Sequence, residues 1–185
     1  IPKERIQVYF IDNEEYFNRK ATFKDSGDKL FKDNDERCIF FAKGVLETIK
    51  RLNWSPDIIH IHGWMSALLP IYLKENFKNE PIFQKSKIVT SLYANEFEKS
   101  LNNDMINKVL FDEIDKKNIS DLKDPTYENL TRIAINYSDG IILGSENISP
   151  KTIKFLKDYK NPILNFQPKD SFSESYIEFY NNLFD

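Results

Sequence analysis

Short, continuous runs of apolar residues alternate with longer amphipathic patterns along this chain, and this alternation constrains the fold more than any other feature. Four of the runs are rich in isoleucine, leucine and valine and cover residues 57–61, 87–93, 140–143 and 162–166. Such runs are typical of strands buried on both faces, as in a parallel sheet. Because helical patterns separate them, the sequence predicts a three-layer α/β/α, Rossmann-like domain with a mainly parallel sheet.

Helical patterns occupy most of the chain between and beyond these runs. Ser149 stands before Pro150 as an N-cap stands before a first helical residue, so a helix is expected there. A helix is also expected from Trp64, with a kink where Pro70 interrupts it. Apolar residues recur at helical spacing in four further segments, the second of which is expected to form one or two helices: 35–53, 101–122, 127–137 and 172–184.

The chain before residue 34 begins with an apolar run and continues as a polar segment. Residues 6–12 indicate a further strand, and residues 13–33 a long loop with room for one short helix. Long loops in compact domains are usually functional. Because 41% of the residues are hydrophobic, they suffice for one core, and we treat residues 1–185 as a single domain. Ile1 is not an initiator methionine, so we expect a partial chain that lacks its extreme N-terminus.

Composition narrows the classes of partner and the compartment. The formal net charge is −3 and no basic stripe with interleaved aromatics occurs, so nucleic acid is not an expected partner. No apolar stretch approaches membrane-spanning length, and the single Cys38 fits a reducing, cytoplasmic environment. His60 and His62 share one face of a predicted strand, but no third ligand stands at a zinc-like spacing, so no metal is expected.

The joint between a predicted strand and a predicted helix at residues 62–64 is the strongest candidate site. His62 ends the strand, Gly63 breaks it, and Trp64 opens the helical pattern. The carboxyl ends of parallel strands meet at one edge of a sheet, where ligands of open α/β domains bind. Tyr93 and Ser145 follow the next two predicted strands, so we expect them at the same edge.

Four blocks of sequence, in order and at comparable spacing, carry a family resemblance. They are VYFIDN and EYF within 8–17, DNDER at 33–37 followed by FF at 40–41, PDIIHIHGW at 56–64 followed by LPIYL at 69–73, and NLTRIAINYSD at 129–139. Together they resemble the N-terminal domain of bacterial glycogen synthases and plant starch synthases, which are retaining glycosyltransferases of the two-domain GT-B type. The resemblance implies that this chain is one half of a GT-B fold.

The resemblance also implies an activity, the transfer of glucose from ADP-glucose to an α-1,4-glucan with retention of configuration. ADP-glucose is then the donor substrate and the α-glucan the partner, with no cofactor and no catalytic residue assigned. The family's phosphate-approaching loop and second domain are not in this sequence, so the chain alone is expected to be inactive. The alternative is a non-catalytic glucan-binding or structural domain derived from the family, which would favour a homo-oligomer.

The sequence departs from the family pattern at two positions where side-chain chemistry matters. Gly63 replaces the aspartate of the family's HDW motif, and Leu92 stands near the place of a family histidine. The end of the chain resembles the last helix of full-length synthases, and its aromatic stripe is expected to pack. Either the second domain was lost and this helix retained, or residues 163–165 are an altered family hinge and the helix is a local extension.

Each candidate residue at the 62–64 joint has a functional and a packing interpretation. His62 is expected to bond a sugar hydroxyl rather than only to pack, whereas His60 is expected to be a core residue. Trp64 either stacks on a sugar ring or packs against the sheet. Gly63 either lets a ligand approach the backbone closely or serves only the turn.

Four more residues complete the candidate site. Tyr93, Asn95 and Glu96 follow a predicted strand, and they either line a cleft or begin a capped helix. Arg37 lies in the predicted helix that Asn34 is expected to cap. Its planar fork either holds a phosphate or carboxylate, or it pairs with Asp33 or Glu36 on the same helix.

Overall fold

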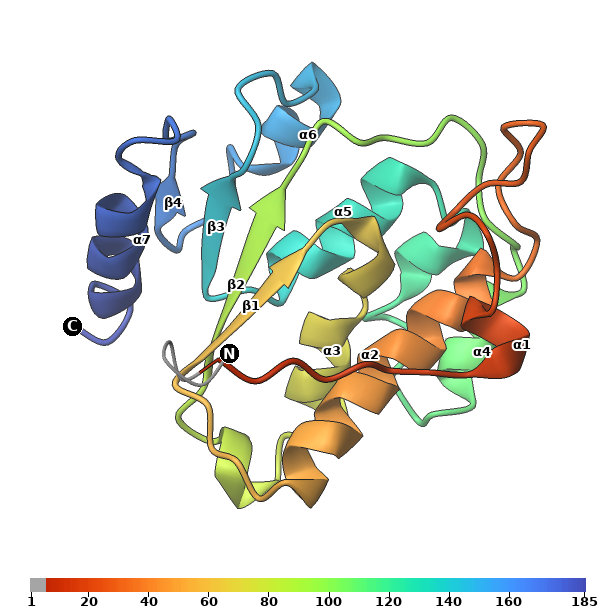
Figure 1. The fold of residues 1–185 in the computed structure, drawn as a ribbon, viewed down its shortest axis with the longest axis horizontal. Coiled ribbons are helices and arrows are strands. Elements are labelled where there is room, and N and C mark those ends of the chain that lie inside the picture. The colour runs from red at the N-terminus through yellow and green to blue at the C-terminus, as the bar shows by residue number, and fades with distance from the viewer. Residues whose placement is uncertain (1–5) are drawn as a thin grey trace.

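A computed structural model describes residues 6–185 and shows a parallel sheet with helices on both faces (Figure 1). In the order in which they lie side by side, the strands are β1 (Ile58–His62), β2 (Lys87–Leu92), β3 (Gly140–Leu143) and β4 (Ile163–Leu164). All three neighbouring pairs are parallel, with His62 opposite Ser91. The predicted α/β class and parallel sheet are therefore confirmed. The first five residues of the predicted domain lie outside the described part.

The helices of the described part are mostly short. None of them, within residues 6–185, combines the length and the apolar character needed to cross a bilayer. The α-helices and 3-10 helices, in chain order, are α1 (Glu14–Phe17), α2 (Asn34–Arg51), η2 (Trp64–Ser66), α3 (Leu69–Glu75), η3 (Pro81–Phe83), α4 (Met105–Leu110), η4 (Ser120–Lys123), α5 (Tyr127–Asn136), α6 (Pro150–Phe155) and α7 (Phe172–Asn181).

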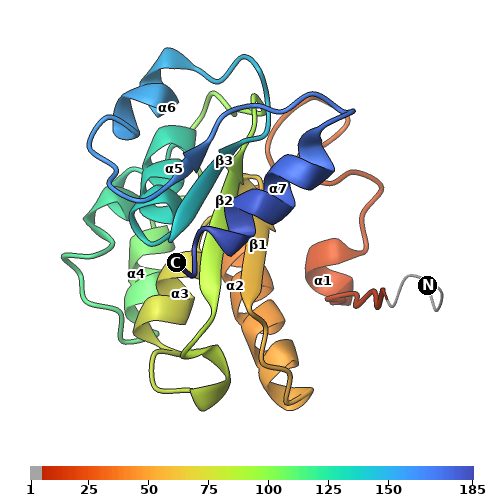
Figure 2. The same cartoon turned by 90° about the vertical axis from the view of Figure 1, so that its left-hand side faces the viewer.

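The strand order distributes the helices unevenly over the two faces of the sheet. Because the strands follow one another in a single direction, right-handed crossovers put their connecting helices on one face. The core on this face joins α2, α3 and α5 to strand residues such as Ile59 and Ile88. On the opposite face, α7 lies across the sheet (Figure 2), and Phe179 of this helix packs on Ile142 together with Leu183, which follows the helix. One helix thus forms the third layer within the described residues.

Local sequence chemistry accounts for where several helices begin. The Thr126 hydroxyl accepts a hydrogen bond from the Asn129 amide at the start of α5, at 3.2 Å. Ser149 caps α6 in the same way, and Pro150 occupies its first turn, as the sequence predicts. α2 carries acidic residues in its first turn and basic residues in its last, which complements the helix dipole.

The predicted strand at residues 6–12 is wrong, because the segment forms no ladder with the sheet. A strand needs a partner for its backbone groups, and this segment instead runs along the outside of the domain with Phe10 87% exposed. Its end is tethered at Ile11, which lies against Gly44 of α2. The short helix expected in the following loop is confirmed as α1.

The expected helix from Trp64 is two helices rather than one kinked helix. η2 ends at Ser66, and α3 begins at Leu69 with Pro70 in its first turn. A proline there removes no helical hydrogen bond, since the first amides have no partner within the helix. The expected cap of α2 is also corrected. Asn34 is the first helical residue, and its side chain donates to the Phe23 carbonyl at 2.9 Å instead.

Candidate functional site

The carboxyl ends of β1 and β2 bring four of the predicted site residues together. His62 ends β1, and its Nδ1 lies 2.7 Å from the hydroxyl of Tyr93, which follows β2. Gly63 lies beside Asn95, since a Cβ built at position 63 would be 3.4 Å from the Asn95 Nδ2. Tyr127 of α5 fixes the segment after β2 by donating from its hydroxyl to the Tyr93 carbonyl at 2.9 Å. His62, Gly63, Tyr93 and Asn95 therefore lie together, and we call these four residues the edge cluster.

The ring of Tyr93 extends from this cluster across the end of β3. A Cβ at Gly144 would lie 2.5 Å from a carbon of the Tyr93 ring, so the ring fills space that only glycine leaves open. The amide of Ala94 also donates to the Ser145 hydroxyl at 3.2 Å. The carboxyl ends of three neighbouring strands are thus joined through side chains.

His60 connects the edge cluster to α7. Its Nε2 lies 2.7 Å from the Ser91 hydroxyl, and its Nδ1 lies 2.7 Å from the Tyr180 hydroxyl. Its ring centroid is 4.0 Å from that of His62. The residue is partly buried and fully bonded, which agrees with a core role, and it ties two strands to the third layer. Within the described residues, no three His, Cys, Asp or Glu side chains converge to hold a metal.

Burial lowers the pKa of both imidazoles. The pKa of His60 falls to about 3, because the ring is buried and because His62 lies beside it. Burial also lowers the pKa of His62, although that residue keeps part of its surface exposed. Both rings are therefore neutral at physiological pH. A neutral imidazole has one donor and one acceptor, and the Nε2 of His62, which has no hydrogen-bond partner within residues 6–185, is free to bond a hydroxyl.

Gly63 has a backbone conformation that other residues rarely adopt. Its φ of 73° and ψ of 173° fall in a region that is essentially restricted to glycine. Glycine at this position therefore sets the path of the chain from β1 into η2. An aspartate, as in the HDW motif of the resemblance, would be strained in this conformation.

We expect the substitution Gly63→Ala to lower the free energy of unfolding by about 1–3 kcal/mol, because the methyl group fits but the positive φ is strained. Urea denaturation followed by circular dichroism measures the loss. Gly27→Ala is the matched control, since Gly27 is without a positive φ and should change stability by less than about 1 kcal/mol. Equal losses in the two variants would contradict the strain argument.

Trp64 lies in the core rather than at the surface of the edge. It is 5% exposed, and its ring centroid lies 4.7 Å from that of Phe23 and 4.9 Å from that of Phe97. The indole therefore connects the 13–33 loop to the segment after β2. Little of the ring is left to stack on a sugar, so the packing interpretation describes its position.

A groove runs from the edge cluster between the 13–33 loop and the segment after β2. It consists of two adjoining hollows of about 350 Å³ and about 650 Å³ that share Lys24, Leu30, Glu96 and Phe97. The smaller hollow is also lined by Trp64 and Asn95, so three predicted site residues, Trp64, Asn95 and Glu96, line this space. We call it the edge groove and define it by the residues that line it: 21–24, 28–32, Trp64 and 95–102.

Arg37 is separate from the edge cluster and lies under the 13–33 loop. It is 3% exposed, and its guanidinium lies 5.3 Å from the ring centroid of Phe17 and 5.5 Å from that of Phe31. Its Nη1 donates to the Asn34 side chain at 2.6 Å, while its buried Nε has no partner among the described residues. Burial lowers its pKa.

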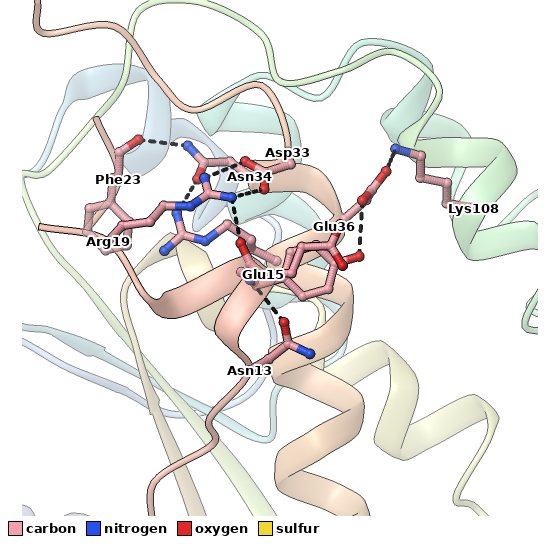
Figure 3. A network of polar contacts seen from close by, with 10 residues as sticks. Asn13, Glu15, Arg19, Phe23, Asp33, Asn34, Glu36 and Lys108 are labelled. Carbon is pink, nitrogen blue, oxygen red and sulfur yellow. Dashed lines mark hydrogen bonds and ion pairs between the residues drawn. The ribbon is translucent and has the colours of Figure 1, made fainter. Parts of the chain in front are cut away.

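The ion pair of Arg37 with Asp33 or Glu36 does not form, because both carboxylates bond other side chains. Asp33 pairs with Arg19, whose guanidinium holds the pKa of Asp33 below its usual value. Glu36 accepts hydrogen bonds from Lys108 and Tyr16 (Figure 3). The network fastens α1 and the 13–33 loop to the start of α2, and so supports one wall of the edge groove.

Comparison with known proteins agrees with this architecture. A family described as the starch synthase catalytic domain matches residues 1–154. The chain is similar to glycogen synthases of Chlorobium limicola, 45% identical over 95 residues, and Chlorobium phaeovibrioides, 37% identical over 115 residues. These matches cover 50% and 62% of this chain but 19% and 24% of the relatives. The chain therefore belongs to the starch synthase catalytic domain family, within the glycogen and starch synthase group of glycosyltransferases.

Proposed function

We propose that this chain forms the acceptor-side wall of a cytoplasmic glycogen or starch synthase, which transfers glucose from ADP-glucose to an α-1,4-glucan with retention. The edge groove is the observation that carries the proposal. It opens beside Asn95 at the carboxyl edge of the sheet, where ligands of open α/β domains bind. Its larger hollow of about 650 Å³ has the size of an ordinary ligand pocket.

The lining of the groove suits a linear glucan. Leu30 and Phe31, which are both partly exposed, supply apolar surface for the C–H faces of glucose units, while lysine and glutamate side chains along the rim can bond hydroxyl groups. The neutral His62 offers a further hydrogen bond at the edge. Retaining transfer also requires groups that stabilise the departing diphosphate. Other parts of the enzyme would supply these groups, so this chain alone is expected to bind glucan without transferring glucose.

A second candidate is a glucan-binding domain without catalytic activity, and two positions favour it. Gly63 carries no side chain where the family has an aspartate. Leu92 stands near the place of a family histidine and is 4% exposed. It packs with Ile135 and Ile141 on the face of the sheet opposite α7. Neither residue has a group that could bond or stabilise a reacting sugar.

Titration calorimetry with maltoheptaose tests glucan binding by the groove. We expect saturable binding by the chain, and about three- to tenfold weaker binding after Asn95→Ala, which removes a polar contact to the sugar, or Glu96→Gln, which replaces a charged acceptor by a weaker neutral one. Glu113→Gln removes an exposed carboxylate that does not line the groove and should leave the affinity unchanged.

A transfer assay with ADP-glucose and glycogen, run on the complete protein, separates the two candidates. Transfer supports the synthase, whereas maltoheptaose binding without transfer supports the non-catalytic domain. An absence of both binding and transfer would overturn the proposed function.

A further inference from the structure

A row of five rings runs from α7 to the end of β2. Phe172 is followed by Tyr176 at 5.6 Å between centroids, Tyr176 by His60 at 6.0 Å, His60 by His62 at 4.0 Å, and His62 by Tyr93 at 6.0 Å. We call these five residues the ring row. It lies on the α7 face of the sheet, whereas the Trp64 and Phe97 rings beside the edge groove belong to the core of the other face.

The row follows from two periodicities. Residues two apart in a strand share a face, so His60 and His62 point the same way from β1. Residues four apart in a helix also share a face, which puts Phe172 and Tyr176 in line along α7. α7 runs opposite to the strands, so its first turn lies level with their carboxyl ends (Figure 1). The start of this helix thus stands beside the candidate site.

Exposure and charge indicate what the row can bind. Phe172 is 43% exposed and His62 is also exposed, so the row reaches the surface. Burial lowers the pKa of both histidines, and no lysine or arginine stacks on a ring of the row within residues 6–185. The row is therefore uncharged, and it combines flat apolar faces with imidazole and phenol groups that can bond hydroxyls.

We propose that the ring row is a second carbohydrate-binding surface, on which the glucose units of an α-glucan stack beyond the edge groove. A pyranose ring has an apolar C–H face and a rim of hydroxyls, which matches the faces and the polar atoms of the row. A nucleobase also stacks on aromatic rings, but a nucleotide would bring phosphates to a row on which no lysine or arginine of residues 6–185 stacks. The inference rests on the proposed function, since it extends the same glucan past His62.

The two histidines give a direct measurement in the unaltered chain. Because the sequence contains only two, their ring Hε1 protons give two NMR signals. We expect maltoheptaose to shift the His62 signal and ADP alone to leave both signals in place. A shift with ADP and none with maltoheptaose would identify a nucleotide surface and overturn the inference.

Two variants test the row by affinity. Phe172→Leu and Tyr176→Leu keep apolar bulk but remove the flat face, and each should weaken maltoheptaose binding about three- to tenfold. Phe111→Leu changes a residue that is 89% exposed after α4 and should have no effect. Thermal unfolding of each variant shows that the fold is retained.

The outcomes separate this inference from the proposed function. If the row variants bind like the unaltered chain while Asn95→Ala and Glu96→Gln bind more weakly, the ring row is not a binding surface and the groove still is. If the unaltered chain does not bind maltoheptaose, the inference fails, and the transfer assay on the complete protein decides whether the proposed function also fails. Weaker binding by the row variants together with a His62 shift supports the inference.

Discussion

Replacing Lys108 with methionine is expected to lower the free energy of unfolding by about 3 kcal/mol at neutral pH. Lys108 of α4 donates to Asp35 at 2.7 Å and to Glu36 at 2.6 Å, in the first turn of α2. The Asp35 side chain is fully buried; its Oδ2 accepts the bond from Lys108, and its Oδ1 has no hydrogen-bond partner among the described residues. Without the ammonium group, a buried carboxylate keeps only the helix dipole for stabilisation. Urea denaturation measures the loss.

Two comparisons make this measurement specific. Lys151→Met breaks an ion pair with Glu128 in which the lysine side chain is 77% exposed, and it should cost less than about 1 kcal/mol. The double variant Asp35→Asn with Lys108→Met removes the buried charge and should recover part of the loss. The interpretation fails if Lys108→Met is no more destabilising than Lys151→Met.

The same contact predicts a pH dependence. The hydrogen bond from Lys108 is the main reason that the pKa of Glu36 lies below its usual value. A lowered folded-state pKa stabilises the fold at pH above the unfolded value of about 4.3, and this contribution is lost as the pH falls through the folded pKa. The stability gap between the unaltered chain and Lys108→Met should therefore narrow in that acid range.

Phe179→Ala is expected to cost about 3–5 kcal/mol, the usual range for removing a buried phenylalanine side chain. Phe179 is 7% exposed and packs with Val89, Ile142 and Leu183 between α7 and the sheet. Because Phe179 is the one buried residue of α7, removing its side chain should also detach the helix from the sheet. We expect the α7 amides to lose their protection from hydrogen exchange before those of β2.

Ile177→Ala is the control for this prediction. Ile177 lies on the same helix but is 60% exposed, so its truncation should change stability by no more than about 0.5 kcal/mol. Similar denaturation midpoints for the two variants would mean that α7 does not depend on Phe179 for its attachment.

The strands that could be predicted from sequence are those with continuous apolar runs. β1, β2 and β3 lie within one residue or so of their predicted bounds, because burial on both faces demands such runs. Residues 6–12 have a similar composition but form no strand of the sheet, and composition alone cannot show whether a segment joins a sheet. The same limit applies near Pro70, because two successive helices and one kinked helix would have the same pattern of apolar residues.

The candidate site was predictable at the level of the sheet edge but not of its contacts. His62, Gly63, Tyr93 and Asn95 lie close together because parallel strands end at one edge, which the alternation of elements implies. The bond from Tyr180 to His60 spans 120 positions and depends on how α7 docks. The surroundings of Arg37 could not be predicted, because a buried, stacked guanidinium has the same local sequence as an exposed one.

The dependence of one sheet face on α7 has a consequence for synthesis. The ribosome makes this helix after all four strands, so that face stays uncovered while the rest of the domain can already pack. A chain that stalls or is cleaved before residue 172 would expose the side chains of Val89 and Ile142 to other nascent chains. This face of the sheet is therefore protected from aggregation only once α7 has been made.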